Sequence, residues 1–164
     1  MATSLMDPIN RFLRRIEEDR DFFMYFSLTD SEALALARKR ARNYLDDAID
    51  RMTMDGKPTI DLSDIDEAAF TFNVTLSRSE IFILSSLMYE YYLAKDISRL
   101  KTLSVNYTGT ELRVFDPSNA RTTFQNLYEN VQKENRVLLD TYRNTDRNTG
   151  SFVSVNDISI DEEG

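Results

Sequence analysis

One segment of this sequence, from Ile81 to about Leu103, restricts the possible folds more than any other. Ser77 and Glu80 before it form the Ser-x-x-Glu capping box that opens a helix. The residues from Ile81 to Ala94 are nearly all apolar, so they lie on every side of that helix rather than along one stripe. A helix of this kind is stable only when other elements cover it. We therefore expect it to be the central helix of a bundle.

Two amphipathic helices are expected before the central one. The first starts at Asp7-Pro8, where an acceptor side chain precedes a proline whose missing N–H costs nothing. The second opens with the capping box of Thr29 and Glu32 and ends near Met54. Helical spacing predicts the following inner faces: Ile9, Phe12, Ile16 and Phe23 in the first helix, and Leu34, Ala37, Ala41, Leu45, Ala48 and Met52 in the second.

A last long helix is expected from Pro117 to about Tyr142, because Asp116-Pro117 repeats the start signal of the first helix. Its middle, from Gln132 to Arg136, is strongly polar and is expected to project beyond the core. Its predicted buried face consists of Ala120, Phe124, Leu127, Val131, Leu138 and Tyr142.

The segments between these helices complete the predicted fold. Residues 55–76 are expected to form a long connection with one short helical turn. Residues 104–115 alternate in a way that fits a small two-stranded excursion or an extended loop. The predicted fold class is all-α, a bundle of about four helices with a short extended or β excursion. The helical domain would span residues 1–143, and an extended C-terminal tail would span residues 144–164.

The C-terminal tail is polar overall but contains residues that favour strands. They are Phe152, Val153, Val155, Ile158 and Ile160. Such a segment can add a strand to the sheet of a partner, where main-chain hydrogen bonds give affinity. The alternative interpretation is a frayed terminus.

The composition removes several classes of chemistry. The chain contains no histidine and no cysteine, which excludes Ser-His and Cys-His hydrolases and thiol chemistry. Four glycines leave little material for a phosphate-binding loop. The remaining carboxylates could still support a magnesium-dependent or carboxylate acid/base enzyme if they were clustered, and this stays an alternative for residues 61–67. We expect no catalytic residue, metal or cofactor. The N-terminus lacks the features of a secretory signal and no apolar run is long enough to span a bilayer, so we expect synthesis in the cytoplasm and no membrane partner.

Two charged clusters are further candidates for contacts. The acidic one lacks the spacing of an EF-hand, so a solvated loop is favoured over a cation site. The basic one surrounds its helix, and a salt-bridged contact between subunits is favoured over contact with nucleic-acid phosphates, because the net charge is −8. The acidic residues are Asp61, Asp64, Asp66 and Glu67, and the basic residues are Arg38, Lys39, Arg40 and Arg42.

Capped helices thus lead to a long central helix (SRSEIFILSSLMYEYYLAKDISRLKTL), an extended link (SVNYTGTELRVFDPSN) and a final helix (ARTTFQNLYENVQKENRVLLDTYRN). This arrangement resembles the small head–tail connector proteins, or neck adaptors, of tailed bacteriophages. The resemblance covers residues 8–143 and depends on architecture and on segments such as LMYEYYLAKDI and ELRVFDPSNA.

The resemblance implies a non-enzymatic structural protein of the virion neck. Such subunits form a ring, typically a dodecamer, that docks beneath the portal protein and continues the DNA channel toward the next neck or tail-completion protein. DNA would pass through the ring without specific binding. The family's contact with the portal through a terminal segment would correspond to residues 150–161 of this chain. The alternative function is a small helical nucleic-acid-binding or DNA-packaging factor that uses the basic cluster.

Overall fold

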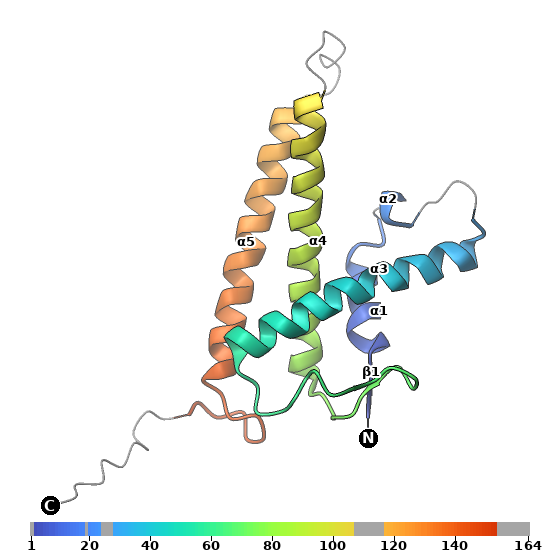
Figure 1. Ribbon diagram of the computed structural model, residues 1–164. Helices are drawn as coiled ribbons and strands as arrows, with labels where there is room; N and C mark the ends of the chain where they lie inside the picture. The colour runs from blue at the N-terminus through green and yellow to red at the C-terminus, as the bar shows by residue number, and fades with distance from the viewer. Residues whose placement is uncertain (1, 19, 24–27, 107–116, 154–164) are drawn as a thin grey trace, which may run out of the picture.

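The computed structural model describes residues 2–18, 20–23, 28–106 and 117–153 of the 164 residues. Four helices of ten residues or more dominate it, and Figure 1 shows α4 and α5 side by side with α3 crossing them. The helical bundle predicted from the sequence is confirmed. The helices are α1 (Met6–Arg15), α2 (Arg20–Phe23), α3 (Asp30–Arg51), α4 (Arg78–Asn106) and α5 (Pro117–Arg143), with a π-helical turn, η1 (Met52–Gly56), after α3.

Helix α4 is the centre of the bundle, as its apolar surface predicted. It packs against α1, α3 and α5. Its side chains Leu84, Leu87 and Met88 are fully buried. The core therefore follows α4, and α1, α3 and α5 together cover it.

Helix α3 begins with the predicted capping box. The Thr29 hydroxyl accepts from the Glu32 backbone N–H at 3.4 Å, and the Glu32 carboxylate accepts from the Thr29 N–H at 2.8 Å. Its inner face is as predicted except for Leu34, the fifth residue of α3, which is 40% exposed. The alanines of this face, Ala37, Ala41 and Ala48, are fully buried, and short side chains allow two helices to approach closely.

Helix α5 has the predicted bounds, and its buried face agrees with the prediction in part. Val131 is buried and Leu138 and Tyr142 pack against the core, as predicted, but Asn135 and Leu139 are also buried, and Phe124 and Leu127 are 37% and 40% exposed. The prediction that the polar stretch 132–136 projects beyond the core is wrong. The Asn135 amide forms hydrogen bonds with α4, so a polar residue occupies an inner position that a hydrophobicity pattern cannot assign.

The β structure is not where the sequence pattern placed it. A three-stranded antiparallel sheet, in the order β1-β3-β2, combines the N-terminus with the 55–76 connection. The helical turn expected in that connection is therefore wrong. Residues 104–106 continue α4 instead of starting an extended segment, and the remainder of the expected excursion, 107–116, lies outside the described residues. The strands are β1 (Thr3–Ser4), β2 (Ile65–Asp66) and β3 (Thr71–Phe72).

Helix α1 starts at Met6, slightly before the predicted Asp7-Pro8 signal, and the Ser4 hydroxyl accepts from the Met6 N–H at 3.1 Å. Its residue Phe12 lies within 6.0 Å, between ring centroids, of three other aromatic rings, and Phe22 is among them. This aromatic cluster holds α1 and α2 against α3 and α4.

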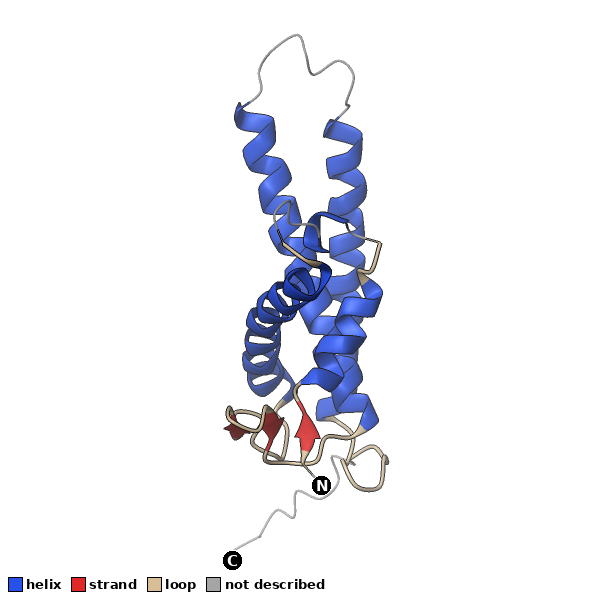
Figure 2. Cartoon of the chain, turned by 90° about the vertical axis from the view of Figure 1, so that its right-hand side faces the viewer, coloured by secondary structure: helices blue, strands red, loops and turns tan. Residues whose placement is uncertain are grey.

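The C-terminal half of α4 and the N-terminal half of α5 extend beyond the rest of the bundle (Figures 1 and 2). The small sheet lies at the opposite end, which is also the end where α4 begins (Figure 2). Within the described part of the chain, no helix combines the length and apolar character that a membrane span requires.

Candidate functional site

The basic cluster on α3 divides into two pairs. Arg40 donates to the Phe22 carbonyl at 3.2 Å and its guanidinium lies 4.3 Å from the Phe22 ring centroid. Arg42 forms ion pairs of 2.9 Å with both Asp46 and Glu67. These two arginines hold the fold together. Arg38 and Lys39 are exposed and remain candidates for contacts with a partner.

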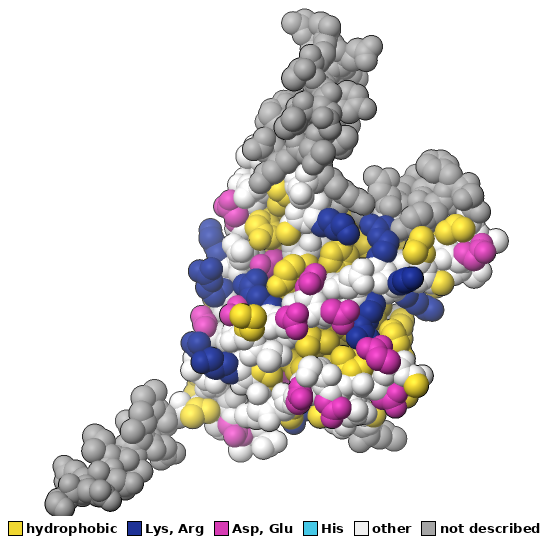
Figure 3. Space-filling model, in the orientation of Figure 1, with side chains coloured by type: hydrophobic (Ala, Val, Ile, Leu, Met, Phe, Trp, Pro, Cys, Tyr) yellow, Lys and Arg dark blue, Asp and Glu magenta, His cyan; other side chains and the backbone are white. Residues whose placement is uncertain are grey.

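The acidic cluster forms several local contacts rather than one site. The Asp61 carboxylate accepts from Ser63, the Asp64 carboxylate accepts from the Asn73 amide at 2.6 Å, and Asp66 accepts from two backbone N–H groups. Glu67 pairs with Arg42 of α3. Nowhere in the described ranges do three or more acidic side chains converge as metal ligands. Figure 3 shows acidic and basic side chains interspersed on the face that carries α3.

The start of the predicted tail folds back on the bundle. Residues 144–153 form a hairpin in which the Asp146 N–H donates to the Ser151 carbonyl and the Val153 N–H donates to the Asn144 carbonyl, both at 2.8 Å. Phe152 and Val153 are 76% and 59% exposed, which leaves them accessible to a partner. The other three candidates, Val155, Ile158 and Ile160, lie outside the described residues.

Arg147 fixes this hairpin to the first turn of α4. Its guanidinium forms two hydrogen bonds with the Glu80 carboxylate, at 2.7 Å and 3.1 Å, and a third with the Thr75 carbonyl. The Tyr142 hydroxyl donates to the same carboxylate at 2.7 Å. The Glu80 carboxylate is fully buried, so its pair with Arg147 is shielded from water. The pair joins two residues that are far apart in the sequence. We call Glu80, Tyr142 and Arg147 the latch.

The protonation states in the latch follow from these contacts. Burial alone raises the pKa of Glu80, but the hydrogen bonds from Arg147, Ser77 and Tyr142 outweigh it and hold the pKa below its ordinary value. Burial, together with the adjacent Glu80 carboxylate, raises the pKa of the Tyr142 hydroxyl. At neutral pH the latch therefore consists of an ionised glutamate, a neutral tyrosine and a charged arginine.

A second buried polar network joins four helices. The Asn135 amide donates to Glu90 at 2.8 Å, and its oxygen accepts from the Ser86 hydroxyl at 2.7 Å. Arg51 of α3 pairs with Glu90 at 3.1 Å, and Arg15 of α1 approaches the Ser86 hydroxyl at 3.5 Å. Because unpaired buried polar groups are costly, this network fixes how α5 is placed along α4.

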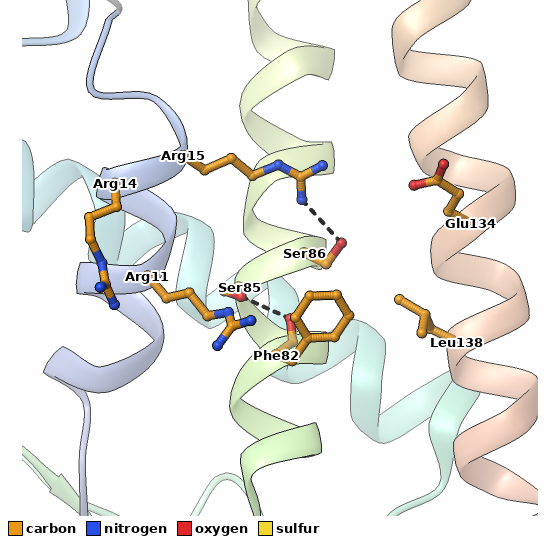
Figure 4. A pocket seen from close by; sticks show the side chains of 8 residues that line it. All are labelled: Arg11, Arg14, Arg15, Phe82, Ser85, Ser86, Glu134 and Leu138. Atoms are coloured by element: carbon orange, nitrogen blue, oxygen red, sulfur yellow. Dashed lines mark hydrogen bonds between the residues drawn. The ribbon is translucent and has the colours of Figure 1, made fainter.

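A groove of about 600 Å³ lies between α1 and α5, on the face of α4 opposite α3 (Figure 4). Three arginines of α1 form one wall, and α5 contributes the other. Arg11 lies 4.9 Å from the Phe82 ring centroid and Arg15 lies 3.9 Å from that of Tyr89. The groove thus combines fixed positive charge with apolar surface. Its lining residues are Arg11, Arg14, Arg15, Phe82, Ser85, Ser86, Glu134 and Leu138. We call it the arginine groove.

The arginines of the arginine groove differ in ion pairing from the arginines that line a second, smaller hollow. Among the described residues, none of Arg11, Arg14 and Arg15 has a carboxylate within ion-pair distance. A smaller hollow of about 360 Å³ lies beside η1 and α5 and also contains arginines. There, Arg51 and Arg143 already pair with carboxylates. None of the three arginines of the arginine groove is paired with a carboxylate of the described residues, whereas two of the three in the smaller hollow are.

Sequence reasoning did not identify the arginine groove. The three arginines of α1 lie at positions i, i+3 and i+4, which share one helix face, and this spacing was the available signal. An amphipathic helix ordinarily has such a charged face toward solvent, so the spacing alone does not distinguish a groove wall from a solvated surface. No protein-family model, curated protein or solved structure gives a significant match to this chain.

Proposed function

We propose that this chain is a non-enzymatic structural subunit of the neck of a tailed bacteriophage. It would form a ring of identical subunits beneath the portal protein and continue the DNA channel toward the next neck or tail-completion protein. The observation that carries the proposal is the projecting pair of long helices, α4 and α5, together with the apolar side chains exposed on it.

Phe124 and Leu127 are the apolar side chains of this projection that we propose contact a neighbouring subunit. They lie three positions apart on α5, so they share one face of the helix, and both are more than a third exposed. They belong to the half of α5 that extends beyond α1 and α3 (Figure 1). Large apolar side chains on a projecting element gain free energy when another subunit covers them. A ring provides such a cover for every copy, because identical interfaces close on themselves.

The charge of the chain fits passage of DNA rather than its capture. A net charge of −8 disfavours the counterion release that drives binding to phosphates. The alternative function, a nucleic-acid-binding or packaging factor, needs the basic cluster of α3. Arg40 and Arg42 are occupied by contacts within the fold, and only Arg38 and Lys39 of this cluster remain exposed. This arrangement favours the adaptor over the nucleic-acid binder.

The experiment that tests the proposal is a mass measurement by light scattering after size exclusion, with and without the portal protein. We expect a large oligomer of this chain, at least when portal is present. The double variant Phe124→Ser/Leu127→Ser should dissociate it. Val137→Ser removes an exposed apolar side chain from the other half of α5 and serves as the matched control. A chain that stays monomeric with portal in excess would contradict the proposal.

A further inference from the structure

We propose that the arginine groove binds the C-terminal segment of the same chain, residues 154–164. The structure describes the chain up to Val153, and the proposal is based on the groove, the point where the chain is anchored and the sequence that follows. It does not depend on the phage function proposed above.

The groove offers positive charge that no carboxylate among the described residues neutralises within ion-pair distance. Arg11, Arg14 and Arg15 form one wall, while Glu134 is the only carboxylate among the residues that line the groove. Arg11 and Arg15 are held over aromatic rings, which fixes their guanidinium planes but leaves N–H donors unused. Guanidinium groups oriented in this way recognise carboxylates through paired hydrogen bonds.

The segment 154–164 has matching chemistry. It contains four acidic side chains and no basic residue, and its apolar residues are separated by polar ones. The carboxylates would meet the arginine wall, and the isoleucines would cover Phe82 and Leu138, which line the same groove. A peptide with both kinds of side chain fits better than the phosphates of nucleic acid, which would leave the apolar surface uncovered. The matching acidic residues are Asp157, Asp161, Glu162 and Glu163, and the apolar ones are Val155, Ile158 and Ile160.

The latch holds the start of this segment within reach of the arginine groove. The latch holds the hairpin 144–153 against the first turn of α4, and Phe82 of the groove follows Glu80 by two residues in that helix. An extended chain of 11 residues spans roughly 36 Å. A tethered segment also has an effective concentration of about millimolar, so even weak affinity leads to binding within one chain. The smaller hollow beside η1 is a poorer site, since two of its arginines are already paired.

Disulfide cross-linking in the full chain tests the proposal, because the chain has no cysteine of its own. One variant combines Glu134→Cys with Ser159→Cys and so places a thiol in the groove. The control combines Asp140→Cys with Ser159→Cys. Asp140 is exposed on α5, lines the smaller hollow and lies nearer to the anchor in sequence, so an unbound segment would reach it at least as readily.

We expect the groove pair to form a cross-link at least about tenfold faster than the control, which corresponds to ~1.4 kcal/mol of preference. The product should have the mass of one chain. Adding Arg11→Gln/Arg14→Gln should reduce the rate to that of the control, whereas Arg38→Gln/Lys39→Gln removes the same charge from α3 and should leave it unchanged. Arg15 is retained because it contacts the buried network. Equal rates for both cysteine pairs, or a cross-link found only between two chains, would overturn the proposal.

Discussion

Arg147 and Glu80 are 67 positions apart, and two hydrogen bonds of 2.7 Å and 3.1 Å join the guanidinium of one to the fully buried carboxylate of the other. This contact fixes the hairpin 144–153, which follows α5, against the start of α4. The hairpin beyond α5 returns to the first turn of α4, so the described chain ends, at Val153, toward the end of the bundle that also carries the small sheet. The latch is therefore a structural device that positions the segment we propose to be functional.

Removing the cation of the latch should destabilise the fold. Arg147→Ala leaves the buried Glu80 carboxylate without its main partner, and an uncompensated charge of this kind costs about 2 to 3 kcal/mol when the lost partner is partly exposed. Urea denaturation followed by circular dichroism measures the change. Arg143→Ala breaks only an exposed pair with Asp140 and should cost less than about 0.5 kcal/mol. Equal effects of the two variants would argue against the latch.

The latch should also make the protein sensitive to acid. The pKa of Glu80 is lower in the folded chain than its ordinary value, so the ionised latch contributes its full stabilisation above about pH 4.5. As pH falls through the lower, folded-state pKa, protonation removes this contribution. Denaturation curves between pH 7 and pH 3 should show that Glu80→Gln, already neutral, loses less stability over this range than the natural chain. An identical pH dependence would contradict this assignment.

Disrupting the buried network around Asn135 should lower the free energy of unfolding. Asn135→Ala removes the amide that joins Ser86 to Glu90 and should lower the free energy of unfolding by about 1 to 3 kcal/mol. Asn126→Ala changes an exposed residue of the same helix and is the control. The measurement is again chemical denaturation. If both variants have the stability of the natural chain, Asn135 does not fix the packing of α5.

The alternative function has its own test. Arg38→Gln/Lys39→Gln removes the exposed half of the basic cluster without disturbing Arg40 and Arg42, which hold the fold. The adaptor hypothesis predicts weak binding to duplex DNA that this double variant does not change. A nucleic-acid-binding factor would instead bind tightly at low salt, weaken steeply as salt rises and lose affinity in the variant. Fluorescence anisotropy with labelled DNA at two salt concentrations distinguishes the two.

The sequence predicted the helices well because their signals are local. The capping boxes at Thr29 and Ser77 mark the starts of α3 and α4, and both form as expected. The small sheet was missed because its strands have two residues each, too few for an alternating pattern. Its pairing also depends on contacts between distant segments, such as the Thr3 hydroxyl that accepts from the Leu76 N–H at 2.8 Å.

The sequence pattern did not predict the buried polar contacts or the arginine groove, because these also depend on distant segments. Asn135 and Glu80 are polar residues with buried partners, and hydrophobicity patterns assign such residues to the surface. Asn135 is satisfied by α4, and Glu80 by a residue of the tail. The arginine groove likewise exists only because α1 and α5 both pack against α4. The projecting Phe124 and Leu127 had the spacing of a core face, and only the structure shows that no part of the described chain covers them fully.

The most direct test of the adaptor function is electron microscopy of the purified chain mixed with the portal protein. The proposal predicts closed rings of this chain seated on one end of the portal, with a central channel and α4–α5 pairs side by side around it. The variant Phe124→Ser/Leu127→Ser should give portal particles without the added ring. Portal particles that remain bare in the presence of excess natural chain would contradict the central claim.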